Sequence, residues 1–289
     1  MLKIPHLCTL SVLLLASFLV NASSTANGQT SLQNPSEFLG FDLGQNFSLH
    51  HQIIDYSKHL SSQTGASLVE YGETYEGRPL QVVVFTHPEN MERLEVIRQQ
   101  HLDRIQGGPG MAEFDGLAIV WMSYNVHGNE AVCSEAALEV MHTLATKCDA
   151  YDPIMKRIVV LVDPCLNPDG HDRYAVWFNQ HASFPANADP KGLEHEEPWP
   201  GGRPNHYLFD LNRDWAWQKQ QESKMRSALY REWMPHVHCD YHEMGYNSPY
   251  YFAPAAEPYH EAITSWQREF QEEIGRDAAD KFDARGELY

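Results

Sequence analysis

The stretch Leu117-Ala118-Ile119-Val120-Trp121-Met122 is followed, five residues after its end, by His127-Gly128-Asn129-Glu130. A continuous apolar run of this kind is typical of a strand in a sheet that is covered on both faces. Residues 130–146 then have the pattern of a long helix. Because ligands of open α/β sheets lie beyond the carboxyl ends of the strands, the polar residues after this run are placed where a functional site is expected.

Short apolar runs and helical segments continue on both sides of this stretch. Strands are predicted over 68–74, 80–86, 157–162 and 236–241, and helices over 50–61 and 91–105. Since strands alternate with helices, the sequence predicts an α/β fold of three layers, with a mixed, mostly parallel sheet covered by helices on both faces. Residues 167–210 lack periodicity and are rich in Pro, Gly, His and Trp, which predicts a long functional loop.

The N-terminal residues 1–26 are typical of a secretory signal peptide. Lys3 gives a short basic start, Leu7 to Val20 form an apolar stretch, and small residues that suit cleavage follow. The stretch is too short for a good transmembrane helix, although an uncleaved anchor is the alternative. We interpret 27–50 as a leader and 51–289 as the catalytic domain, and expect a secreted or periplasmic protein without stable membrane insertion.

The net charge of the chain and the spacing of its cysteines argue against several classes of binding partner and functional site. Acidic residues outnumber basic residues 39 to 21, giving a formal net charge of −18. Such a surface repels phosphates, which argues against nucleic acid or an anionic membrane as the main partner. Beyond the signal peptide the cysteines are irregularly spaced, which argues against a zinc ribbon or a redox motif and leaves disulfides or free thiols open.

Two separated motifs together supply a set of metal ligands. His127 and Glu130 are three residues apart and could bind one metal from the same side. His242 follows a predicted strand, and with the first pair it completes the His₂Glu set of a catalytic zinc site with a position open for water. Zinc would lower the pKa of that water and polarise the scissile carbonyl. Taken singly, each motif is more often structural.

A third motif, Asp210-Leu211-Asn212-Arg213-Asp214, is suited to a carboxylate. The amide of Asn212 and the planar guanidinium of Arg213 could hold a substrate carboxylate through a forked hydrogen bond. A surface ion pair of Arg213 with Asp210 or Asp214 is the alternative.

The motifs occur in an order that resembles the zinc carboxypeptidase family, the carboxypeptidase A-like metallopeptidases. They are His127-x-x-Glu130, Asn167-Pro168-Asp169-Gly170, Asp210-x-Asn212-Arg213 and His242, preceded by Glu76-Gly77-Arg78-Pro79. The resemblance extends from about residue 71 to 252. It implies a mixed eight-stranded sheet, one Zn²⁺ per chain, and hydrolysis of C-terminal bonds of peptides or proteins by a zinc-activated water.

The resemblance also implies roles for single residues. His127, Glu130 and His242 would be the zinc ligands, and Asn212 and Arg213 would anchor the C-terminal carboxylate of the substrate. Asp210 would correspond to the acidic residue that orients the first zinc histidine.

Two departures from the family pattern affect catalysis. The family's oxyanion Arg, commonly in a Trp-Arg pair, has no direct counterpart, and Arg173 and Arg203 are both possible substitutes. The general-base Glu and the closing Tyr lie well beyond the third ligand in the family, and neither is found before Tyr289. Glu243 is interpreted as a structural residue or as one that supports a ligand from behind, and Glu287 is too near the third ligand for the family pattern. We therefore expect a catalytic domain that is incomplete at its C-terminus, binds zinc and turns over poorly.

Two other functions stay open. An amidohydrolase or deacylase on the same fold would remove acyl groups from N-acyl amino acids, but the long 167–210 segment favours a peptide substrate. A non-catalytic zinc- or peptide-binding relative is the other possibility, and the intact set of ligand and anchoring residues argues against it.

Overall fold

The computed structural model describes residues 32–107, 116–146, 152–245 and 248–289, so the predicted signal peptide lies outside the described residues. The described chain contains a mixed sheet of five strands. They are β1 (Ser67–Glu73), β2 (Pro79–Phe85), β3 (Ala118–Tyr124), β4 (Ile158–Asp163) and β5 (Val237–Tyr241). Each corresponds to a predicted strand, with only small differences at the ends.

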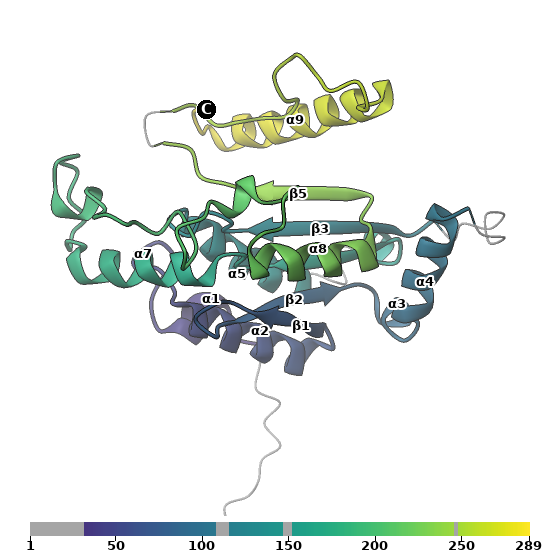
Figure 1. The fold of residues 1–289 in the computed structure, drawn as a ribbon, viewed down its shortest axis with the longest axis horizontal. Coiled ribbons are helices and arrows are strands. Elements are labelled where there is room, and N and C mark those ends of the chain that lie inside the picture. Colours follow the sequence, from purple (N-terminus) through teal and green to yellow (C-terminus); the bar gives the residue numbers. More distant parts are fainter. Residues whose placement is uncertain (1–31, 108–115, 147–151, 246–247) are drawn as a thin grey trace, which may run out of the picture. The chain divides into compact units, whose positions relative to one another are not determined.

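The strands are arranged in the order β1-β2-β4-β3-β5, and Figure 1 shows β1 and β5 at opposite edges of the sheet. β2 is antiparallel to both β1 and β4, whereas β3 is parallel to both β4 and β5. All strands except β2 therefore point the same way, which confirms the predicted mixed, mostly parallel sheet.

One face of the sheet is covered by α2 (His50–Thr64) and α5 (Val132–Thr146). Val83 and Phe85 of β2 point to this face and join a buried cluster with residues of both helices. Leu138 of α5 is fully buried in the same cluster. The alternate residues of β2 point to the opposite face, as the two-residue period of a strand requires.

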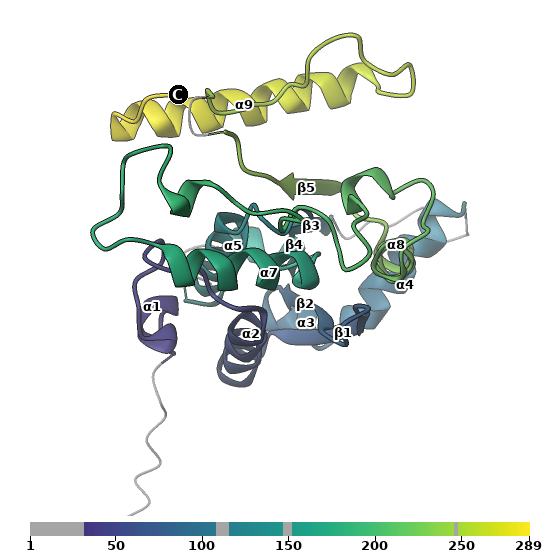
Figure 2. The same cartoon turned by 60° about the vertical axis from the view of Figure 1, so that its left-hand side comes forward.

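The opposite face is covered by α4 (Leu94–Ile105) and α8 (Gln221–Trp233). Val82 and Val84 of β2 pack there together with Trp121 of β3 and side chains from both helices. The sheet thus lies between two helical layers, as Figures 1 and 2 show, and the predicted three-layer α/β fold is confirmed.

Shorter elements and α9 complete the described chain. They are α1 (Pro35–Leu39), α3 (Pro88–Met91), α6 (Asp152–Met155), α7 (Pro168–His181), η2 (Leu193–His195), η3 (Leu211–Arg213) and α9 (Ser265–Arg285). No helix among the described residues is both long enough and apolar enough to cross a membrane. Cys133, Cys165 and Cys239 are free thiols, and Cys148 lies outside the described residues.

The prediction of a continuous loop over 167–210 is wrong for its first third, because α7 occupies Pro168–His181. Asn167 caps this helix by accepting a hydrogen bond from the Gly170 N–H at 3.1 Å, and Pro168 takes the first helical position. The ring of Phe178 packs against Phe47 with 4.8 Å between ring centroids. Tertiary packing therefore stabilises a helix whose first turn contains Pro and Gly.

Part of the segment interpreted as a leader packs onto the core. Leu32, Phe38 and Leu43 lie against the buried cluster under α2 and α5. Ser48 is fully buried, and its backbone N–H donates to Oε1 of Glu135 at 2.7 Å. From residue 32 onwards this segment therefore belongs to the same compact unit as the sheet.

Candidate metal centre

The parallel pairing of β3 and β5 brings two distant histidines together. Tyr124 at the end of β3 is paired with Tyr241 at the end of β5. His127 lies in the loop after β3, and His242 directly follows β5. Because both strands run the same way, both histidines emerge at the carboxyl edge of the sheet, where open α/β sheets bind ligands.

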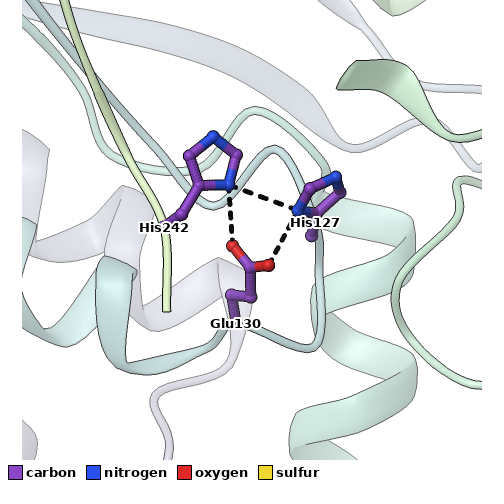
Figure 3. A group of neighbouring side chains, drawn as sticks. All are labelled: His127, Glu130 and His242. Atoms are coloured by element: carbon purple, nitrogen blue, oxygen red, sulfur yellow. Dashed lines mark hydrogen bonds and ion pairs between the residues drawn. The ribbon is translucent and has the colours of Figure 1, made fainter. Parts of the chain in front are cut away.

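His127, Glu130 and His242 form a compact group of three possible ligands (Figure 3). Oε1 of Glu130 lies 2.8 Å from Nδ1 of His127, and Oε2 lies 3.0 Å from Nδ1 of His242. The two Nδ1 atoms are 3.3 Å apart.

This spacing fits one ion held between the three side chains. Two nitrogens bound tetrahedrally to one zinc at about 2.0–2.1 Å are themselves about 3.3 Å apart. Ring nitrogens that face both each other and a carboxylate stabilise a positive charge between them, either a proton or a metal ion. The group also contains the nitrogen and oxygen ligands that zinc prefers.

The electrostatics of the group favour positive charge at its centre. Although burial opposes ionisation, hydrogen bonds to His127 and His242 lower the pKa of Glu130 to about 2. Hydrogen bonds to Asp240 and Glu130 raise the pKa of His242 to about 10. The carboxylates thus attract a positive charge to this point, and a bound metal would compete with a proton for it.

Each histidine of the group has a carboxylate on its far side. Nε2 of His127 lies 3.2 Å from Oδ1 of Asp210, the residue expected to orient it. Nε2 of His242 lies 2.9 Å from Oδ2 of Asp240, which sequence reasoning missed. The signal was present: Asp240 and His242 are two residues apart at a strand end and so share one face of β5.

Arg173 and Arg203, the two possible substitutes for the family's oxyanion Arg, have different surroundings in the structure. Nη2 of Arg203 lies 3.0 Å from Oδ2 of Asp210, and its Nη1 lies 3.7 Å from Oε1 of Glu130. Arg173 instead donates to the carbonyl oxygen of Gly201 at 2.8 Å and to further backbone carbonyls of the same loop. Arg203 therefore lies at the centre, whereas Arg173 fixes the loop that carries it.

Asn212 and Arg213 lie beside the centre on η3. The backbone N–H of Asn212 donates to Oδ1 of Asp210 at 2.9 Å. Arg213 is exposed, and within the described chain its guanidinium forms no ion pair and donates to the carbonyl oxygen of Asn212 at 3.3 Å. Asp214 instead accepts hydrogen bonds from the N–H groups of Lys219 and Gln220. The surface ion pair considered as an alternative is therefore not formed.

Gly128 and Gly170, from two of the predicted motifs, pack directly on each other and on Gly202 beside the centre. A Cβ on Gly128 would lie 2.3 Å from the backbone of Gly170 and 2.5 Å from the carbonyl oxygen of Gly202. A Cβ on Gly170 would lie 2.2 Å from the same oxygen. Since any side chain would collide with backbone, this close approach requires glycine at these positions.

Glu243 points away from the centre. Its Oε1 accepts a hydrogen bond at 2.8 Å from the N–H of Val132, the first residue of α5. Only its backbone faces the group, where the N–H donates to Oε2 of Glu130 at 3.2 Å. Its contacts are those of a structural residue.

A second group of possible ligands consists of Glu76, Asp169 and His206. The guanidinium of Arg78 donates to Glu76 and, at 2.8 Å, to Asp169. It also donates to Asp172 at 2.9 Å. The carboxylates of this second group are therefore already paired closely with a fixed positive charge, whereas the guanidinium nearest to Glu130, that of Arg203, lies 3.7 Å away.

Comparison with known proteins concerns the family of the chain. The family model described as zinc carboxypeptidase matches residues 53–275. No match was found among curated proteins.

Solved structures that match this chain include thrombin activatable fibrinolysis inhibitor and two carboxypeptidases. Thrombin activatable fibrinolysis inhibitor is 14% identical with a TM-score of 0.55, and the alignment covers 84% of this chain and 58% of that one. The metallo-carboxypeptidase from Burkholderia cenocepacia is 18% identical with a TM-score of 0.50, covering 76% and 47%. The carboxypeptidase A from Helicoverpa armigera is 17% identical with a TM-score of 0.49, covering 75% and 49%.

These structural similarities concern the fold. The chain spans about half the length of several of these structures, and its described residues form five strands where the complete family fold has eight. Because the family model covers most of the chain, from α2 to α9, the predicted family is confirmed. The chain belongs to the zinc carboxypeptidase family.

Proposed function

We propose that this chain is an exported zinc metallocarboxypeptidase that acts on the C-termini of peptides or proteins. The observation that carries the proposal is the convergence of Nδ1 of His127, Nδ1 of His242 and both oxygens of Glu130 on one point. These three residues would hold the Zn²⁺. When bound, the zinc would lower the pKa of a water and polarise the scissile carbonyl.

The residues around the metal ligands would bind the rest of the substrate. Arg203 lies next to Glu130 and is 44% exposed, so its guanidinium can donate to the carbonyl oxygen as negative charge develops there. A single donor of this kind typically contributes about 2.7–4 kcal/mol to lowering the barrier. Arg213 and Asn212 would bind the terminal carboxylate. The proposal assigns no general base.

Export is proposed from residues 1–26, whose basic start, apolar stretch and small residues are typical of a signal peptide. Recovery of the protein outside the cytoplasm, with an N-terminus that begins after this segment, would test export independently of the metal.

Elemental analysis of the purified chain tests the metal centre. We expect one zinc per chain in the wild type and none in His127→Ala, because two remaining ligands do not hold the ion. Absence of zinc from the wild type, or equal zinc in both proteins, would contradict the proposal.

A substrate comparison tests the reaction class. The proposal predicts release of free C-terminal amino acids from a peptide and none from an N-acyl amino acid. The reverse preference would identify a deacylase on the same fold.

A further inference from the structure

Asp240 belongs to a chain of hydrogen bonds that ends at the metal centre. Its Oδ2 lies 2.9 Å from Nε2 of His242. Its Oδ1 accepts a hydrogen bond from Oγ of Ser123 at 2.9 Å. Oγ of Ser123 in turn lies 2.9 Å from Nε2 of His238. Both oxygens of the Asp240 carboxylate are therefore held, one by the sheet and one by the proposed ligand.

The strands themselves fix this chain in place. Ser123 of β3 is the register partner of Asp240 of β5 in the parallel ladder. His238, Asp240 and His242 are spaced by two residues, so they point to one side of β5. A carboxylate mounted on a hydrogen-bonded strand is held more rigidly than one on a loop.

The direction of each hydrogen bond follows from the groups involved. A carboxylate only accepts, so the hydroxyl of Ser123 donates to Asp240 and accepts from the Nε2–H of His238. For the same reason Nε2 of His242 carries the hydrogen that it shares with Asp240. A neutral imidazole has one N–H. When a metal ion takes the place of the proton that Nδ1 of His242 shares with Glu130, Asp240 keeps the remaining N–H on Nε2, so that Nδ1 presents its lone pair to the metal.

We propose that Asp240 is a positioning residue for the metal centre, which orients the ring of His242 and selects the tautomer whose Nδ1 can bind the metal. The inference rests on the proposed function, in which His242 is a zinc ligand. Carboxylates that accept the second N–H of a ligating histidine raise its basicity as a ligand. Asp210 is placed similarly behind His127, but it also pairs with Arg203.

The test measures zinc affinity in the full chain, by competition with a chromophoric chelator, for the wild type, Asp240→Asn and Asp240→Ala. Loss of a carboxylate that accepts the second N–H of a ligating histidine lowers metal affinity by about 10–100-fold, and we expect Asp240→Ala to lower the zinc affinity by this factor. Asp240→Asn keeps the shape but not the charge, so a smaller loss is expected. Cys239→Ala, at the neighbouring position of β5, is the control and should keep wild-type affinity.

Thermal melting of the metal-free proteins separates positioning from mere structural support. Positioning predicts weaker zinc binding with a metal-free melting temperature near that of the wild type. If Asp240→Ala does not fold, Asp240→Asn decides. Wild-type zinc affinity in the folded Asp240 variants would overturn the inference alone, whereas a wild type that binds no zinc would overturn the proposed function as well.

Discussion

Replacing Arg213 by alanine should weaken the binding of a free peptide C-terminus and leave the binding of the same peptide's C-terminal amide unchanged. Arg213 is exposed, forms no ion pair within the described chain and donates only to the carbonyl oxygen of Asn212 at 3.3 Å. Its planar fork is therefore available to a carboxylate, with which it can form two parallel hydrogen bonds.

The expected magnitude follows from the charge of both partners. A hydrogen bond to a charged group contributes about 1.5–3 kcal/mol. Since about 1.4 kcal/mol corresponds to a factor of ten, the Kd of the free-acid peptide should rise about 10- to 150-fold in Arg213→Ala. Asn212→Ala should have a smaller effect, because its side-chain amide is neutral.

Isothermal titration of the zinc-loaded protein with a matched pair of peptides, one free acid and one amide, measures this effect. Arg276→Ala is the control, because Arg276 is an exposed arginine in α9 that pairs with Glu272. An equal loss for both peptides, or no loss for either, would refute the assignment of Arg213 to the terminal carboxylate.

Three further outcomes are expected. Burial lowers the pKa of His50 from 6.5 to about 4, so the contribution of its neutral ring to the free energy of unfolding is complete above pH 6.5 and is lost as the pH falls through 4. Urea denaturation between these pH values should show the wild type losing about 3 kcal/mol relative to His50→Gln, and parallel pH profiles of the two proteins would contradict this. Gly128→Ala should lower the stability by about 1–3 kcal/mol, because its Cβ collides with backbone, and should lower the zinc content. Gly245→Ala, whose Cβ would lie 3.4 Å from Oγ of Ser248, should change neither quantity. Thermal melting and elemental analysis measure the two effects. Where peptide hydrolysis is measurable, Arg203→Ala should reduce kcat about 10²–10³-fold with the zinc content unchanged, and a loss confined to KM would argue against an oxyanion role.

The sequence predicts best where burial and local chemistry agree. The run 117–122 is apolar on both sides because β3 lies inside the sheet, and the proposed zinc ligands follow strand ends in motifs that can be identified without coordinates. The parallel pairing of β3 and β5 then brings His127 and His242 together.

Helix α8 was not predicted because the first half of its buried side is polar. Glu222, Ser223 and Arg226 are almost completely buried, so the apolar contacts of the helix are confined to its second half, where Leu229 and Trp233 join the buried cluster. The guanidinium of Arg226 instead lies 3.6 Å from the ring centroid of Trp215. Binary patterning fails where a helix packs through polar groups and a stacked cation.

The missed parts of the site depend on contacts between distant segments. The position of Asp240 opposite Ser123 is a consequence of strand register, which local pattern does not specify. The choice between Arg173 and Arg203 likewise depends on how the 199–210 segment folds over the centre. The position of Asp240 and the choice between the two arginines therefore follow only from the three-dimensional structure.

Anomalous diffraction at the zinc edge, from crystals of the zinc-loaded chain, tests the central claim most directly. We predict one peak about 2.0–2.2 Å from Nδ1 of His127, Nδ1 of His242 and a carboxylate oxygen of Glu130. A zinc peak at Glu76, Asp169 and His206 instead, or no ordered zinc at His127, would contradict the account.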